Sequence, residues 1–291
     1  MRQFHRRGRH RGPHRLGRAW TAAGSTLLTL LALATSPASA AAGAGPRGPL
    51  QPVHAVRPSP DASLSVRVFA TREGLVGGVT ANGHVIRERD HFVALPSRLG
   101  LSVRGGGERS VRVCAPNGRC AYAPVWDVGP WNTTDDYWNP RRQSWTDLPQ
   151  GLPQAQAAYA GGYHGGRDEF GRAVANPAGI DLGDGTFWDA LRLADNSWVT
   201  VSFLWTGAPG PRGRVTTGGL PLHLRAGPGT AAASTGLAGE HAQLPIQCQV
   251  RGQRIVGAVR TTDLWNRVAP GTFVSHAYVS VPAGFTVPSC R

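Results

Sequence analysis

The sequence contains no lysine, and its single methionine is Met1. All 31 basic residues are therefore arginine, against only 17 acidic ones. The most apolar run, residues 27–34, is shorter than the ~20 residues that a membrane-spanning helix needs. There are only four cysteines, and no pattern of close Cys or His pairs typical of zinc. These absences argue against a membrane span and a metal site, and we expect no cofactor.

The N-terminal sequence has the pattern of an export signal. Residues 1–18 hold seven arginines and no acid, an apolar stretch follows up to Ala34, and residues 36–40 are Ser-Pro-Ala-Ser-Ala. A basic segment, an apolar segment and small residues in this order are typical of a cleaved signal peptide. We expect residues 1–40 to be removed and the protein to be secreted, extracellular or wall-associated; an uncleaved anchor is the alternative, and the export route is open.

Without residues 1–40 the chain keeps 24 arginines against 17 acids, a net charge of +7. Residues 61–206 have a net charge of −1, whereas residues 216–291 carry six arginines and two acids. No strongly basic recognition element stands out, so we predict no nucleic-acid partner. A modestly basic tail on an exported protein suits an anionic cell-wall surface.

The four cysteines predict two disulfides, because an even number in an exported chain usually pairs. Cys114 and Cys120 flank Asn117-Gly118, a strong signal for a tight hairpin turn. We therefore predict Cys114–Cys120 and, for the tail, Cys248–Cys290.

Composition divides the chain into five parts. Residues 41–61 and 207–215 are rich in Gly and Pro and read as a stem and a linker. Strand-like alternation occurs at residues 65–69 and 197–205, and residues 153–159 and 186–193 have helical character. With the signal at 1–40, we predict domains at 62–206 and 216–291.

Two aspartates follow apolar runs and precede turn-forming glycine. Asp127 lies in Pro-Val-Trp-Asp-Val-Gly-Pro-Trp, residues 124–131, and Asp181 lies in Gly-Ile-Asp-Leu-Gly-Asp-Gly, residues 179–185. A carboxylate where a strand leaves the core can serve catalysis or sugar binding, or can simply bond turn amides.

In sequence order, residues 80–83 (Thr-Ala-Asn-Gly), 94–96 (Ala-Leu-Pro), the two cysteines, 127–130 (Asp-Val-Gly-Pro) and 180–182 (Ile-Asp-Leu) resemble a double-psi β-barrel. The closest groups are the rare-lipoprotein-A, barwin and expansin-like proteins, and the resemblance covers about 62–206. It implies a mainly β fold and a groove for peptidoglycan or another polysaccharide.

Some of these relatives are lytic transglycosylases in which an aspartate is the acid and base, and the matching residue here is Asp127. Trp126 and Trp131 would raise its pKa by their apolar surroundings. The histidine that the cleaving relatives place before the Leu-Pro step has no counterpart in register, since His91 comes too early. Expansin-like relatives loosen polysaccharide without hydrolysis, so the fold leaves catalysis open. Asp181 is expected to fix the barrel crossing and to border the bound ligand.

Residues 131–172 have the character of an insertion, and aromatic residues crowd its first part, residues 131–145. It contains Trp131, Tyr137 and Trp138 among Asp, Asn and Arg, a mixture suited to stacking and hydrogen bonding with sugars. With Trp126 they form the predicted ligand-binding aromatic set. The alternative is that these rings fold back into a small core.

Residues 216–291 resemble the bacterial SH3 family. Residues 219–230 (Gly-Leu-Pro-Leu-His-Leu-Arg-Ala-Gly-Pro-Gly-Thr) match its opening, and Trp265 and Tyr278 fall in its closing segments. The resemblance implies a small SH3-like β-barrel that binds cell-wall peptides, with Tyr278 at the groove.

The combination of an export signal, a double-psi-like domain and an SH3-like domain resembles secreted proteins of actinobacterial type. The expected fold is mainly β: a six-stranded double-psi β-barrel with short helices plus a small SH3-like β-barrel. The expected function is binding or remodelling of peptidoglycan or another wall polysaccharide, without catalysis, by a monomer. The alternatives are a lytic transglycosylase or glycoside hydrolase using Asp127, and a secreted inhibitor-like interaction protein.

Overall fold

The structure is a computed structural model that describes residues 63–291 except 208, 209 and 211. The predicted signal peptide and almost all of the stem lie outside the described residues. Within the described part, no helix is both long and apolar enough to cross a bilayer.

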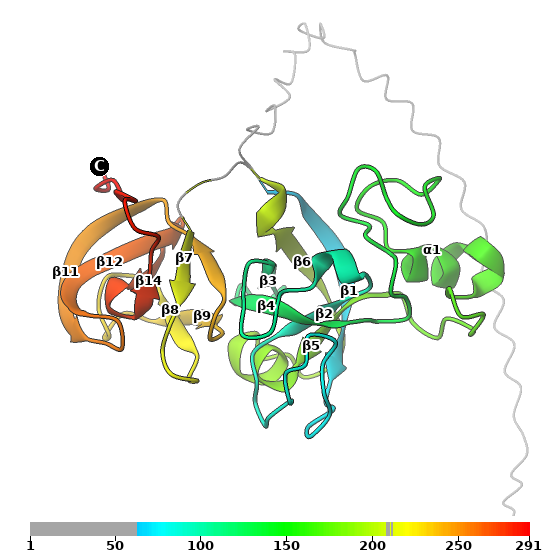
Figure 1. Cartoon of the computed structure of the whole chain (residues 1–291), viewed down its shortest axis with the longest axis horizontal. Helices are drawn as coiled ribbons and strands as arrows, with labels where there is room; N and C mark the ends of the chain where they lie inside the picture. Colours follow the sequence, from blue (N-terminus) through cyan, green and yellow to red (C-terminus); the bar gives the residue numbers. More distant parts are fainter. Residues whose placement is uncertain (1–62, 208–209, 211) are drawn as a thin grey trace, which may run out of the picture. The chain divides into compact units, whose positions relative to one another are not determined.

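The first part of the chain forms a closed β-barrel (Figure 1). Its six strands pair in the ring β4–β2–β5–β1–β6–β3 and back to β4. The β1–β5 and β2–β4 pairs are parallel and the other four are antiparallel. This confirms the predicted mainly β fold with a six-stranded barrel. The strands are β1 (Ser65–Glu73), β2 (Val93–Leu95), β3 (Ser110–Cys114), β4 (Cys120–Val128), β5 (Ala178–Gly183) and β6 (Ser197–Phe203).

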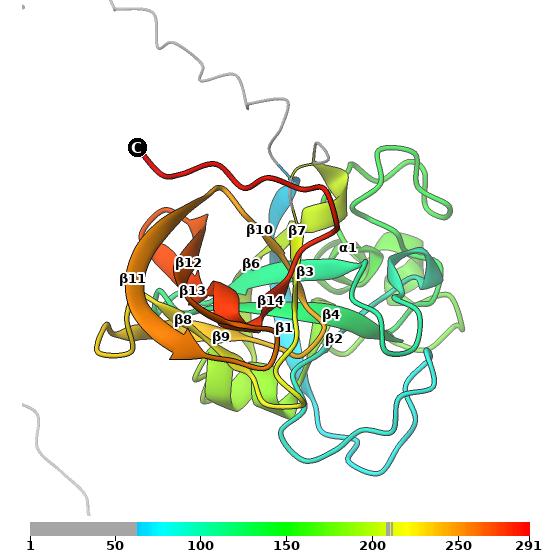
Figure 2. The same cartoon turned by 60° about the vertical axis from the view of Figure 1, so that its left-hand side comes forward.

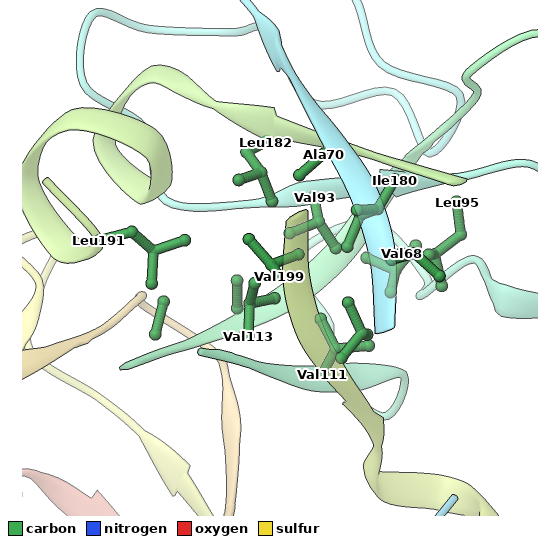
Figure 3. Close-up of a cluster of buried hydrophobic side chains, with 14 of the residues drawn as sticks. Val68, Ala70, Val93, Leu95, Val111, Val113, Ile180, Leu182, Leu191 and Val199 are labelled. Carbon is green, nitrogen blue, oxygen red and sulfur yellow. The ribbon is translucent and has the colours of Figure 1, made fainter. Parts of the chain in front are cut away.

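Aliphatic side chains from all six strands fill the barrel (Figure 3). Val68 and Ala70 of β1 and Ile180 and Leu182 of β5 are fully buried there. Burial of each larger aliphatic side chain contributes roughly 1.5–3 kcal/mol. Because side chains alternate along a strand, Asp181, between Ile180 and Leu182, faces away from this interior.

The β3–β4 hairpin has the predicted turn. Gly118 has φ +81°, a left-handed conformation that glycine adopts without a steric penalty. Cys114 and Cys120 are directly paired across the strands and form a disulfide. The predicted bridge is confirmed.

Both predicted helical segments have helical structure. Helix α1 (Gln154–Gly161) begins after Pro153 and ends at Gly162, whose φ is +64°; Figure 1 shows it outside the ring of strands. The second segment forms a single wide turn, η3 (Gly185–Ala190). In it Phe187 is buried, whereas Trp188 is 39% exposed.

The second part of the chain forms two further groups of strands (Figure 2). One runs β11–β12–β13–β8–β9, and the other runs β10–β7–β14. Cys248 and Cys290 form the second predicted disulfide, which is confirmed. The strands are β7 (Arg212–Val215), β8 (Leu222–Arg225), β9 (Ser234–Ala238), β10 (Gln243–Pro245), β11 (Cys248–Val256), β12 (Thr261–Ala269), β13 (Thr272–Ser275) and β14 (Val279–Ser280).

Strand β4 contributes to both hydrophobic cores. Ala121 and Ala123 point into the barrel, and Tyr122 between them belongs to the core of the second part. The Tyr122 hydroxyl donates a hydrogen bond to the Val268 carbonyl at 3.2 Å. Beside Tyr122, β4 pairs in parallel with β9, so one hydrogen-bonded sheet connects the two parts.

Candidate functional site

Four neighbouring barrel strands carry a row of residues formed by Thr71, Asp181, Ala94 and Asp127. Thr71 on β1 pairs with Asp181 on β5, Asp181 pairs with Ala94 on β2, and Ala94 pairs with Asp127 on β4. Ala94, whose side chain is small, therefore lies between the two aspartates in this row. The barrel thus brings together two aspartates that are far apart in the sequence.

Asp181 is fixed by its neighbour on β1. The Thr71 hydroxyl donates a hydrogen bond to Asp181 Oδ1. Burial raises the pKa of Asp181 to about 6, although the Thr71 hydrogen bond lowers it, and the nearby Asp127 charge adds to the increase. Asp181 is therefore largely ionised at neutral pH and titrates in mildly acidic solution.

Asp127 is held by backbone amides. Its Oδ1 accepts hydrogen bonds from the N–H groups of Ala81 and Val128, both at 2.8 Å. Ala81 belongs to the Thr-Ala-Asn-Gly turn, and the Asn82 N–H also bonds to the Trp126 carbonyl at 3.2 Å. Two motifs that the sequence analysis singled out are therefore in direct contact, and the turn orients the Asp127 carboxylate.

Glu73, at the end of β1, completes the group of acids. Its side chain is buried, the residue being 9% exposed, and within the described structure its Oε2 has no hydrogen-bond partner. Burial, a hydrogen bond with Asp127, and the charges of Asp127, Asp181 and Asp184 raise the pKa of Glu73 to about 9. Glu73 is therefore a neutral, protonated acid at pH 7.

An arginine–tryptophan cluster adjoins these acids. Arg72, next to Glu73 in β1, forms a 2.7 Å ion pair with Asp184. The Arg72 and Arg89 guanidinium groups lie 4.6 and 5.1 Å from the centroid of the Trp188 ring. Trp188 is partly exposed, so this cluster presents both aromatic and cationic surface.

The aromatic residues predicted to bind sugar are mostly buried. Trp126 is 6% exposed and packs with Phe92, while Tyr137 is fully buried and Trp138 is 4% exposed. Tyr137 donates a hydrogen bond from its hydroxyl to the Gly179 carbonyl at 2.9 Å. These three rings belong to hydrophobic cores, which is the alternative role that their crowding suggested.

Trp131 differs from these three because it is only half-buried. Its indole N–H donates to Asn176 Oδ1 at 3.1 Å, and the Arg172 guanidinium lies 5.9 Å from its ring centroid. Its ring packs against the cluster of Ala155, Ala158 and Val174, and its role in sugar binding stays a prediction.

The acids of the insertion are occupied within the insertion itself. Asp135 is buried and paired with Arg142, and the Asp168 carboxylate is paired with Arg172 at 2.5 Å. Glu169 accepts hydrogen bonds from the backbone and hydroxyl of Thr133. These carboxylates hold the long loop together.

A hollow of about 500 Å³ lies on the second part of the chain. Tyr278 lines it, together with the exposed side chains of Leu220 and Val256 and the basic Arg225 and Arg254. The residues lining it include no acid. Its surface is apolar and positively charged.

Across the described residues, no group of three His, Cys, Asp or Glu side chains is arranged to hold a metal ion. Thr71, Glu73 and Asp184 were not among the residues that the sequence singled out. The signal for Thr71 and Glu73 is their position at the end of β1, where polar residues follow the apolar alternation of residues 66, 68 and 70.

The family model and the curated protein that are similar to this chain have no described activity. Residues 64–202 match a family model described as a domain of unknown function, DUF8814. A curated protein of Bacillus subtilis (strain 168), the uncharacterized protein YraI, is 31% identical over 85 residues, which are 26% of this chain and 71% of that protein. The chain belongs to the same family as YraI.

One solved structure is that of a mutant of the Clavibacter michiganensis expansin in complex with cellohexaose. The likeness covers 75% of this chain and 85% of that chain, with 14% identity and a TM-score of 0.27. Because this TM-score is low, the likeness supports no conclusion about the fold or the ligand of this chain.

Proposed function

We propose that this protein is an exported cell-wall protein that binds a wall polysaccharide at the carboxyl row of its barrel. The row carries the proposal because it brings two half-buried carboxylates, Asp127 and Asp181, together on neighbouring strands of the barrel. Carboxylate oxygens accept hydrogen bonds, and sugar hydroxyls donate them, so the row complements a polysaccharide.

Export rests on two features. The basic and apolar segments of residues 1–40 predict a signal peptide. The two disulfides suit an oxidising compartment outside the cytoplasm. A barrel that closes as the double-psi resemblance predicts also supports a polysaccharide ligand.

The second part of the chain serves, in this proposal, to hold the protein on the wall. Its resemblance to bacterial SH3 domains implies a peptide-binding role, and Tyr278 lines its apolar and basic hollow. Arg225 and Arg254 there complement the carboxylates of wall peptides or other anionic wall components.

A pull-down assay tests the polysaccharide site. The mature chain is incubated with purified peptidoglycan sacculi and, in parallel, with cellulose. We expect retention on sacculi and an affinity that is about 10- to 100-fold weaker for Asp127→Asn and Asp181→Asn, since a lost hydrogen bond to a charged group costs about 1.5–3 kcal/mol. The matched control is Asp195→Asn, at an exposed aspartate. Wild-type protein that stays in solution with both polymers contradicts the proposal.

The basic hollow is tested in the same assay. Arg254→Ala should weaken retention on sacculi and reduce its salt dependence. Arg251→Ala is the control on the same strand, because Arg251 is exposed and forms its ion pair with Asp263 away from the hollow. Equal retention of both variants would remove the anchoring role from this surface.

A further inference from the structure

A larger hollow, of about 940 Å³, lies where β1 begins and where the chain leaves β6. It is lined by Ser65 of β1, by Trp205 in the single turn η4 (Leu204–Thr206), by Arg109 just before β3 and by part of the insertion. No residue of the carboxyl row lines it. Thr71 comes six residues after Ser65 in β1, which is about 20 Å of extended strand. This Trp205 hollow is therefore separate from the carboxyl row.

Trp205 presents a fixed aromatic ring in the hollow. Its ring centroid lies 5.4 Å from that of Phe203 and 5.8 Å from that of Trp138, both in edge-to-face contact. Phe203 and Trp138 are themselves buried in the barrel core, so they hold the indole in one orientation. Trp205 remains only half-buried. A ring that is already fixed loses little conformational entropy when a ligand stacks on it.

Arg109 adds a positive charge that no acid neutralises in the described structure. Its guanidinium lies 5.5 Å from the centroid of the Trp205 ring. Within the described residues Arg109 forms no ion pair, and those that line the hollow include no acid. Arg212 lies close enough for the Arg109 charge to lower its pKa, in addition to the larger effect of burial. Two neighbouring cations without an acid favour the binding of an anion.

Amide side chains from the insertion complete the lining. Asn139 donates a hydrogen bond to Asp136 at 3.0 Å, and Gln150 donates one to the Trp138 carbonyl at 2.9 Å. These bonds hold both amides at the hollow. An amide carries both donors and acceptors, so it can bond to sugar hydroxyls in either direction.

We infer that the Trp205 hollow binds an acidic saccharide, whose ring stacks on Trp205 and whose anionic group pairs with Arg109. An aromatic ring and amides suit the sugar, and the unpaired guanidinium suits its charge. The planar guanidinium fork matches a carboxylate or a phosphate with two parallel hydrogen bonds, even while its face lies over an aromatic ring. This site is a second one, and it does not depend on the carboxyl row.

The two sites select for opposite charge. Asp127 and Asp181 repel an anionic sugar, whereas Arg109 attracts it. Acidic units of a wall polysaccharide are therefore favoured at the Trp205 hollow and disfavoured at the carboxyl row.

A titration followed by NMR tests the site. The ¹⁵N-labelled mature chain is titrated with oligogalacturonate and, as the matched ligand, with neutral galactose oligomers of the same length. The indole N–H signal of Trp205, identified by its absence from Trp205→Phe, reports on this hollow. We expect it to shift with the acidic oligomer, which should bind at least about tenfold more tightly than the neutral one. Added salt should reduce this preference.

Two arginine variants separate a specific contact from general charge. Arg109→Gln keeps a polar side chain but removes the charge, so its affinity for oligogalacturonate should fall at least about tenfold. Arg104→Gln is the matched control, because Arg104 is exposed and does not line the hollow, and it should bind as wild type does. Galactose 1-phosphate in a parallel titration shows whether a phosphate can replace the carboxylate. Binding of either anionic sugar, dependent on Arg109, supports the inference.

Equal affinity for the acidic and neutral oligomers would overturn the inference, as would Arg109→Gln binding oligogalacturonate within threefold of wild type. Loss of binding in Arg254→Ala, with Arg109→Gln unaffected, would assign the anion to the hollow of the second part and overturn it too. None of these outcomes bears on the carboxyl row, which is tested by retention on sacculi and by Asp127→Asn.

Discussion

The Thr71 hydroxyl donates a hydrogen bond to Asp181 across the parallel pair formed by β1 and β5. One residue lies near the start of the barrel sequence and the other near its end. Their contact places a carboxylate at fixed orientation beside Asp127 and Glu73, so it connects the closure of the barrel to the chemistry of its acid group.

Two substitutions should move the pKa of Asp181 in opposite directions. Thr71→Val removes a hydrogen bond that favours the ionised form, so the pKa should rise above about 6; Asp127→Asn removes a neighbouring negative charge, so it should fall. Titration of ¹³C-labelled aspartate carboxyl groups by NMR measures both. Thr71→Val should also lower the free energy of unfolding by about 1 kcal/mol. Shifts of the same sign in both variants would contradict this assignment of causes.

Glu73 should make the protein less stable as the pH rises. Its pKa is about 9 when folded against an ordinary value of 4.5, so the folded state binds more protons between these values and stability falls from about pH 4.5 to 9. Glu73→Gln, neutral at every pH, should match wild type near pH 4 and exceed it at pH 7.5 by up to about 4 kcal/mol, which is three pH units at 1.36 kcal/mol each. Urea unfolding at several pH values measures this. Glu88→Gln is the control, and a constant difference between Glu73→Gln and wild type at all pH values would refute the protonated state.

The two disulfides should contribute unequally to stability. Cys248 and Cys290 are 42 residues apart, whereas Cys114 and Cys120 are six apart. Loop-closure entropy predicts about 4 kcal/mol for the longer loop and about 2 kcal/mol for the shorter one. Replacing each pair by serine and comparing urea unfolding midpoints tests the ranking. A larger loss from the Cys114–Cys120 pair would contradict the entropic account.

The connection between the two parts of the chain should depend on Gly236. A Cβ atom at this position would lie 1.7 Å from the Cys120 carbonyl oxygen, where β9 pairs with β4. Gly236→Ala should therefore disrupt that pairing and lower the free energy of unfolding by about 3 kcal/mol. It should also increase tryptic cleavage after Arg212 or Arg214. Gly161→Ala, where a Cβ would meet nothing within 4 Å, is the control; equal effects of both variants would argue against a tight strand contact.

The amino-acid sequence alone was sufficient for local features. Asn117-Gly118 specifies the β3–β4 hairpin because these residues readily adopt left-handed backbone conformations, and the flanking cysteines pair as expected. Pro153 and the good helix formers after it specify α1. Asp127 and Asp181 stood out because each follows an apolar run and precedes glycine, and the structure places both in one row.

The burial of Tyr137 and Trp138 could not be read from the sequence. An aromatic ring in a polar segment has the same local signature whether it stacks on a sugar or packs on a core, and only the packing against Phe203 decides the matter. The raised pKa of Glu73 has the same origin in tertiary structure. Glutamate ionises normally in isolation; burial at the end of β1, beside acids from two other strands, gives it a proton at neutral pH. Local propensities follow from neighbours in sequence, whereas burial and charge–charge interactions depend on which strands the closed barrel brings together.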